Sequence, residues 1–272
     1  MAKCFFTADG SGWFTPTEHT RGPWHPDHCH AGPPTGLLAR SMEKLLNTET
    51  GITRDQNGFQ RLTRMTVTLH RPIPMDAVRV DAKIRRQGRS VSLLEAHLSD
   101  RAGKTCAVAE GLHMLVREPH DYPTQSRQFG AVADAKPGSF PIKSGTHSLP
   151  AFNHGVETRY PDGQDGQPGP TTLWLKTVPL LADETPSPFQ RICPLADCGN
   201  AFSRNAEPDA ITFVNPDLTL VLHRDPVGEW LGSQSAGYWE PSGIGMADAL
   251  LFDELGVAGR AVQTLLLSPV NT

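Results

Sequence analysis

The chain has 272 residues, of which 38% are hydrophobic and 20% are charged, and its formal net charge at pH 7 is −4. This balance excludes the basic surface of a nucleic-acid-binding domain, and no apolar run approaches the roughly 18 residues of a membrane span. Five cysteines are few and odd in number, and the amino-terminal segment lacks the apolar core of a signal peptide, so we expect reduced thiols in a cytoplasmic protein.

The first half of the chain predicts one helix followed by an antiparallel meander. Residues 36–46 carry apolar side chains at helical spacing, and Pro33 and Pro34 just before them suit a helix start. Alternating segments and a hairpin signal at Asp100-Arg101-Ala102-Gly103 then indicate strands. These strands are expected at 64–70, 78–84, 91–98 and 106–116, after a short strand pair within 5–24.

The second half predicts the same order of elements. Residues 119–150 are interrupted by proline and glycine, and we interpret them as a linker between an amino-terminal domain, 1–118, and a carboxy-terminal domain, 151–272. A helix is expected around 187–200. The strands are expected at 156–160, 172–178, 218–223, 229–236, 243–252 and 259–267.

The two halves also repeat each other in sequence. Leu69-His70-Arg71-Pro72 recurs as Leu222-His223-Arg224-Asp225, and His223 lies 153 residues after His70. The same shift aligns Glu110 with Gln263. A period of this length is too long for a solenoid and indicates a duplicated domain, whose copies can meet about a pseudo-twofold axis. A helix and an antiparallel meander, present twice, predict α+β domains in which a curved sheet wraps a helix.

Two polar residues of the second half are candidates for a buried site. Asp197 has small, apolar neighbours, so it is either an exposed helix residue or cap, or a buried carboxylate. Gln263 shares a strand face with Ala261 and Leu265; if that face is buried, its amide must be hydrogen-bonded, and otherwise it faces solvent. Asn215 begins an Asn-Pro-Asp turn.

Other patterns have simpler interpretations. The histidine-rich segment 25–30 has no second Cys or His cluster to complete a zinc site, so we interpret it as a polar loop and expect no metal. Arg71 and Arg224 match across the repeat, which favours shared architecture, although both could bind phosphate. The chain contains neither a Gly-x-Ser-x-Gly elbow nor a phosphate-binding Gly-x-x-x-x-Gly-Lys loop.

The order and spacing of these pieces resemble the double hotdog acyl-CoA thioesterases, the thioesterase II-like type. The resemblance covers nearly the whole chain and implies an α+β tandem hotdog, with two long helices wrapped by a continuous curved antiparallel β-sheet. The chain departs from the family at Ala31, where glycine is usual, and at Asn215, where some members have threonine. The matching segments are 30–34, 36–40, 69–72, 88–90, 195–197, 215–219, 223–230 and 259–263.

The resemblance also implies a reaction, the hydrolysis of a fatty or related acyl-CoA thioester to free acid and CoA without a cofactor. The family's catalytic trio falls on Asp197, Asn215 and Gln263, with Asp197 accepting a proton from water. Gly32 and Thr35 would supply backbone N–H donors to the thioester oxygen at the helix start. The phosphates of CoA would need cations, and the resemblance does not choose among Arg71, Arg86, Arg89 and Arg224.

The duplication implies a second, symmetric site, which we expect to be inactive. It would pair Glu110 with the other helix start, and the first helix offers only Glu43 as an acid. Two alternatives to a thioesterase remain open: a hotdog enoyl-CoA hydratase and a non-catalytic acyl-CoA-binding protein. Pairing of chains through edge strands into a homo-oligomer is also open.

Overall fold

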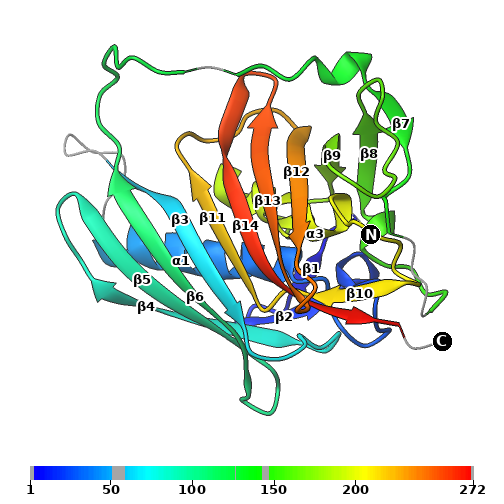
Figure 1. Ribbon diagram of the computed structural model, residues 1–272. Helices are drawn as coiled ribbons and strands as arrows, with labels where there is room; N and C mark the ends of the chain where they lie inside the picture. Colours follow the sequence, from blue (N-terminus) through cyan, green and yellow to red (C-terminus); the bar gives the residue numbers. More distant parts are fainter. Residues whose placement is uncertain (1–2, 51–58, 126, 143–146, 271–272) are drawn as a thin grey trace.

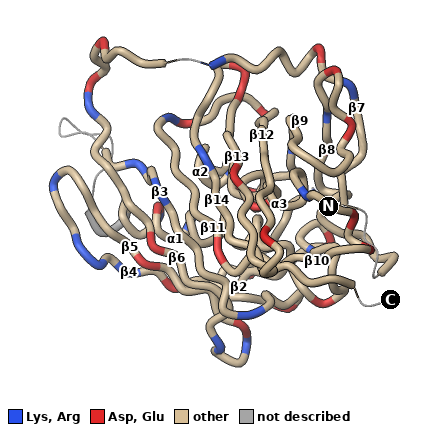
Figure 2. The backbone as a smooth tube through the Cα atoms, viewed as in Figure 1, with Lys and Arg blue, Asp and Glu red and all other residues tan. Residues whose placement is uncertain are grey.

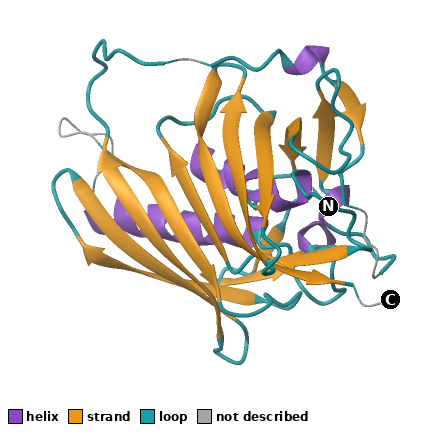
Figure 3. Ribbon diagram, in the orientation of Figure 1, coloured by secondary structure: helices purple, strands orange, loops and turns teal. Residues whose placement is uncertain are grey.

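A computed structural model describes residues 3–50, 59–125, 127–142 and 147–270 (Figure 1). The strands form one sheet of 14 strands with antiparallel neighbours, which curves around the helices (Figure 3). The fold prediction, two hotdog units with one continuous antiparallel sheet, is confirmed. No helix among the described residues is both long and apolar enough to cross a membrane.

The helices are α1 (Gly32–Thr50), α2 (Pro188–Ala196) and α3 (Gly199–Phe202), with 3-10 turns η1 (Glu18–Thr20), η2 (Val132–Asp134) and η3 (Phe152–His154). The strands of the first half are β1 (Phe6–Ala8), β2 (Trp13–Pro16), β3 (Gln60–Leu69), β4 (Val78–Arg86), β5 (Val91–Ser99) and β6 (Thr105–Leu115). Those of the second half are β7 (Lys136–Gly138), β8 (Val156–Tyr160), β9 (Thr171–Thr177), β10 (Ile211–Val214), β11 (Asp217–Leu222), β12 (Leu231–Trp239), β13 (Ile244–Asp253) and β14 (Gly256–Pro269). The sheet order is β1-β2-β4-β5-β6-β3-β11-β14-β13-β12-β9-β8-β7, and β10 also pairs with β14.

The two halves meet where β3 pairs with β11. In this register Thr66 lies opposite Thr219, and their hydroxyl oxygens are 3.2 Å apart. The two threonines are 153 residues apart in the chain, which is the shift of the sequence repeat. The pseudo-twofold axis predicted from the repeat therefore passes between these two residues, and the duplication continues one sheet across both copies.

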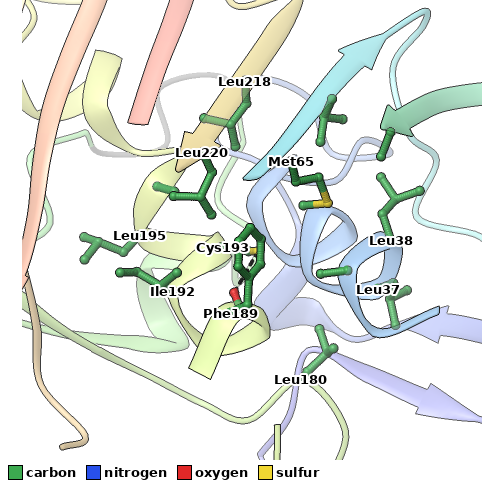
Figure 4. Packing of buried hydrophobic residues seen from close by; sticks show 14 of the residues in the cluster. Leu37, Leu38, Met65, Leu180, Phe189, Ile192, Cys193, Leu195, Leu218 and Leu220 are labelled. Atoms are coloured by element: carbon green, nitrogen blue, oxygen red, sulfur yellow. Dashed lines mark hydrogen bonds between the residues drawn. The ribbon is translucent and has the colours of Figure 1, made fainter. Parts of the chain in front are cut away.

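The helices supply the core that the sheet encloses. Leu37, Leu38 and Met42 of α1 are buried, and Figure 4 shows the first two close to Met65 of β3. Ile192 of α2 lies in the same cluster, near residues of β11. Burial of each such side chain stabilises the fold by roughly 1.5–3 kcal/mol, so the α1–α2 contact joins the two halves strongly.

The second helix differs from the long helix that we expected, because it is broken in two. Ser187 caps α2, its hydroxyl accepting from the Gln190 N–H at 3.1 Å, and Pro188 occupies the first turn. Pro194 lies in the last turn, where it lacks the N–H that would continue the helical bonds. The chain leaves the helix at Asp197 and resumes it in α3, so the interruption presents the Asp197 side chain at a helix end.

The segment predicted as the linker is partly regular, and residues 126 and 143–146 of it lie outside the described part. It contains η2 and β7, and β7 extends the sheet by pairing with β8. Phe129 stacks on Phe252 with ring centroids 3.9 Å apart, which attaches the segment to the second half. Phe140 and Ile142, near its end, reach the cavity described next.

Candidate active site

A cavity of about 580 Å³ lies between the two halves, beside the start of α1. The loop before α1 and the segment after β3 form one wall, while the α2–α3 junction and the β10–β11 connection form the other. Its polar lining includes His30, Asp197, Asn200 and Asn215. Its apolar lining includes Trp24, Ile73, Phe140, Ile142, Ala201 and Phe213.

Asp197 is buried at the centre of a hydrogen-bond network, with only 5% of its surface exposed. Its Oδ1 accepts from Asn215 Nδ2 at 2.9 Å and from Gln263 Nε2 at 3.0 Å. Its Oδ2 lies 3.2 Å from His30 Nδ1. The structure thus brings together the three residues of the predicted trio, which are far apart in the sequence, and leaves Oδ2 on the His30 side of the carboxyl group.

Gln263 lies on the buried face of β14 together with Ala261 and Leu265, which decides between the two interpretations of its position. Its Oε1 accepts from the backbone N–H of Asn200 at 3.1 Å. Its Nε2 therefore points at Asp197, where it also approaches the backbone oxygen at 3.2 Å. Both ends of the amide are hydrogen-bonded, and its orientation is fixed.

Asn200 joins this network and was missed in the sequence. Its Nδ2 donates to Asn215 Oδ1 at 3.3 Å, so the Asn215 amide is also oriented with its nitrogen toward Asp197. Asn200 lies three residues after Asp197, a spacing that places side chains on one helix face. That spacing was the available signal, but the break between α2 and α3 was not predicted.

Burial raises the pKa of Asp197 to about 7, and the hydrogen bonds from Asn215, the Gly32 backbone and Gln263 oppose this shift. Burial also lowers the pKa of His30 to about 3. The imidazole is therefore neutral near pH 7, while the carboxyl group can exchange a proton in that range. A carboxylate with a pKa near neutrality, in a cavity, is suited to act as a base.

His30 was interpreted as part of a polar loop, but its ring turns inward. It stacks on Phe152 with centroids 4.1 Å apart, and its Nδ1 accepts from the Gly32 N–H at 3.1 Å. Its Nε2 lies 3.7 Å from Cys198 Sγ, and that thiol donates to the Pro194 carbonyl oxygen at 3.1 Å. On the Gly32 contact we assign the ring proton to Nε2, which makes Nδ1 an acceptor 3.2 Å from Asp197 Oδ2. The signal that separates His30 from the neighbouring histidines is its place at the start of the matching segment 30–34.

The start of α1 approaches the site closely at Gly32. A Cβ there would lie 2.8 Å from Pro194 Cα, so only glycine permits this packing of α1 on α2. The predicted role of Thr35 has no support, because its backbone N–H and its hydroxyl both bind the Ala31 carbonyl oxygen, at 3.0 and 2.9 Å. Ala31 lines the cavity, and its N–H has no hydrogen-bond partner among the described residues.

The prediction that a second, symmetric site would use Glu110 is wrong. Glu110 is exposed, and it pairs with Thr66, whereas Thr219 pairs with Val262. The last strand of the second copy is thus shifted by one residue relative to the first, and a shift of one reverses the side-chain faces. The inward position that corresponds to Gln263 is held by Gly111, whose added Cβ would meet Met42 Sδ at 2.7 Å.

The histidine-rich loop does not gather metal ligands. His25 and His28 stack on each other with centroids 4.1 Å apart, while His30 faces Asp197. Within the described ranges, no three His, Cys, Asp or Glu side chains are placed to hold a metal ion.

This architecture and cavity define a tandem hotdog protein. The chain belongs to the acyl-CoA thioesterase family: residues 20–114 match the acyl-CoA thioesterase N-terminal domain, and residues 123–267 match the C-terminal domain. No curated protein matches the chain.

Solved structures share the fold at low sequence identity. A candidate thioesterase from Novosphingobium aromaticivorans is 15% identical, with a TM-score of 0.69, covering 98% of this chain and 100% of that one. The tesB protein of Mycobacterium avium is 12% identical, with a TM-score of 0.66 and coverage of 97% and 96%. The acyl-CoA thioesterase II TesB2 of Mycobacterium marinum is 12% identical, with a TM-score of 0.61 and the same coverage.

Proposed function

We propose that the protein hydrolyses acyl-CoA thioesters to a free acid and CoA, with Asp197 as the general base. The observation that carries the proposal is the carboxyl group of Asp197, which lies in a cavity with its Oδ1 held by two oriented amides. Its pKa of about 7 lets it take a proton from water near neutral pH. Membership in the acyl-CoA thioesterase family supports the substrate class.

In the proposed reaction a water molecule beside Asp197 Oδ2 attacks the thioester carbonyl carbon. Ionised Asp197 accepts one proton of that water as the oxygen–carbon bond forms, and the C–S bond then breaks to release the thiolate, which takes up that proton. Asn215 and Gln263 hold the carboxylate in place through Oδ1, so that Oδ2 keeps its direction.

The developing oxyanion needs donors at the start of α1. The Gly32 N–H donates to His30 Nδ1 and also lowers the pKa of Asp197, so it is engaged in this structure. Ala31 lines the cavity, and its N–H has no partner among the described residues. We propose that this N–H donates to the thioester oxygen, aided by the positive end of the α1 dipole. Alanine in place of the family's usual glycine keeps this donor, because the backbone N–H is common to both residues.

The apolar lining provides the space for an acyl group. Trp24 and Phe213 meet edge to face, with centroids 5.5 Å apart, and Phe140 lies beside Ile142 in the same part of the cavity. Such a lining favours a hydrocarbon or aromatic acyl chain over a polar one.

The test is thiol release by the purified protein from a panel of short, medium, long and aromatic acyl-CoAs. We expect turnover on at least one class, with one free thiol formed for each acid released. Consumption of an enoyl-CoA with loss of its conjugated absorbance and without thiol release would instead indicate a hydratase. Binding of acyl-CoA without any turnover across the panel would indicate a non-catalytic binding protein, and either result would overturn the proposal.

A further inference from the structure

Arg71 lies at the edge of the same cavity, directly after β3. It is exposed and lines the cavity, and its backbone N–H donates to the Cys106 carbonyl oxygen at 3.3 Å. The guanidinium group has no hydrogen-bond or ion-pair partner among the described residues. The cavity therefore has a charged donor group at one edge that the fold itself does not use.

The matching arginine of the second copy is fully engaged. Arg224 forms a two-pronged ion pair with Asp253, at 2.7 and 2.6 Å, and the Asp253 side chain is completely buried. It also donates to the carbonyl oxygens of Val257 and Gly256, at 3.0 and 2.6 Å. The interpretation of the arginine pair as shared architecture holds for Arg224.

The first copy has an aspartate at the place that corresponds to Asp253, but this aspartate does not pair with Arg71. Asp100 accepts from the backbone N–H of Lys104 at 2.9 Å, within its own hairpin. The repeat thus keeps both members of the pair and separates them in the copy whose arginine faces the cavity.

The charged side chains in the described part of the cavity lining are Asp197 and Arg71. Asp197 is the sole carboxylate among the described residues that line the cavity, and it lies at the buried site with His30. Three more histidines, His25, His28 and His70, line the cavity with Arg71 and carry ring N–H donors. The rival arginines, Arg86 and Arg89, belong to the hairpin between β4 and β5, where Figure 2 shows positive charge at the left edge of the molecule, and neither lines the cavity.

We propose that Arg71 is the residue that binds a phosphate group of the CoA carrier, while the thioester lies at Asp197. A guanidinium group with free N–H donors matches phosphate oxygens in a two-pronged geometry. The inference rests on the proposed function for the position of the thioester. It assigns carrier recognition to one residue, and it assigns Arg224 to the fold alone.

The experiment compares Arg71→Ala with Arg89→Ala, an exposed arginine outside the cavity that gives the same change in net charge. Each variant and the wild type are assayed on an acyl-CoA and on the acyl-pantetheine with the same acyl group, which lacks the phosphates. Arg71→Ala is expected to lower kcat/KM for acyl-CoA by about tenfold or more, mainly through KM, as for the loss of a charge-assisted hydrogen bond. Hydrolysis of acyl-pantetheine should change by less than about twofold, and Arg89→Ala should resemble the wild type on both substrates.

An equal loss on both substrates would overturn the phosphate assignment, and so would an unchanged KM for acyl-CoA. Calorimetric titration of the same three proteins with CoA measures their affinity for CoA, which does not depend on turnover. If the wild type binds CoA, Arg71→Ala binds it about tenfold more weakly and no protein releases thiol, then the Arg71 assignment stands and the thioesterase function fails. If the wild type does not bind CoA, or Arg71→Ala binds it equally well, the assignment of Arg71 is wrong.

Discussion

A buried carboxyl group, Asp197, and a partly buried one, Glu43, occupy related places in the two copies. Asp197 ends α2 and faces the start of α1 at Gly32, whereas Glu43 lies within α1 and faces the start of α2 at Ser187. Burial raises the pKa of both groups above the ordinary value. Both copies of the duplicated fold therefore hold an acid at the partner helix's first turn.

The two carboxyl groups differ in the hydrogen-bond partners of their second oxygen atom. Both Glu43 oxygens accept hydrogen bonds, from the Ser187 hydroxyl at 2.9 and 2.8 Å and from Gln190 Nε2 at 2.6 Å. Ser187 also caps α2, so this carboxyl group supports a helix start. At Asp197 the two amides take Oδ1, and Oδ2 faces His30 beside the cavity. The Glu43 carboxyl group is thus held on both oxygens by side chains at the α2 start, whereas Oδ2 of Asp197 lies beside the cavity without an amide donor.

Replacing each acid by its amide tests this comparison most directly. Asp197→Asn should lower kcat for thiol release by about 10²–10⁴-fold, because the amide cannot accept the proton from water. Glu43→Gln should leave kcat within about twofold, since its oxygens serve the α2 start. Circular dichroism of both variants controls for folding. Activity in Asp197→Asn equal to that of the wild type would remove Asp197 from the mechanism.

Gln263 and Glu110 are aligned by the sequence repeat but differ in burial. Gln263→Leu removes a donor to Asp197 and leaves the Asn200 N–H without its acceptor. We expect kcat to fall on the order of a hundredfold and the free energy of unfolding to fall by about 1–3 kcal/mol. Glu110→Leu changes an exposed residue and should affect neither quantity. Denaturant titration and thiol release measure the two effects, and equal losses in both variants would contradict the one-residue shift.

Gln263 and Glu110 also show which features of the fold and the site could be predicted from the sequence and which could not. Alternation and turn signals were enough for the main strands of the meanders, and the repeat predicted a pseudo-twofold axis, which the structure places between Thr66 and Thr219. The sheet face on which a strand residue lies depends on the register of its strand. The sequence alignment of Glu110 with Gln263 does not reveal that β14 is shifted by one residue relative to β6. The inward direction of the His30 ring likewise depends on contact with Phe152, more than a hundred residues away, which local sequence does not report.

The pH dependence of the wild type follows from the raised pKa of Asp197. The carboxyl group is ionised above about pH 7 and protonated below it, and only the ionised form accepts a proton. We therefore expect kcat/KM to be constant above this pH and to fall about tenfold per unit below it. Thiol release in buffers from about pH 5 to about pH 9 measures this fall, the acidic limb of the kcat/KM profile. A profile that stays flat through pH 5 would show that the essential group is not a carboxyl with a raised pKa.

The smallest expected effect concerns His30, which distinguishes the Asp197 site from the Glu43 site. His30→Phe keeps an aromatic ring for stacking on Phe152 but removes the Nδ1 acceptor. Protonated Asp197 then loses Nδ1 as the acceptor of its hydroxyl hydrogen. The Gly32 N–H, which no longer donates to Nδ1, can donate to the ionised carboxylate. Both changes favour the carboxylate, so the limb of kcat/KM should move to lower pH by up to about one unit. His28→Phe, a cavity histidine stacked on His25, is the control and should leave the limb in place. A limb that moves to higher pH would mean that Nδ1 carries the proton and donates to ionised Asp197, which would reverse the assigned tautomer and make His30 a donor like the amides on Oδ1.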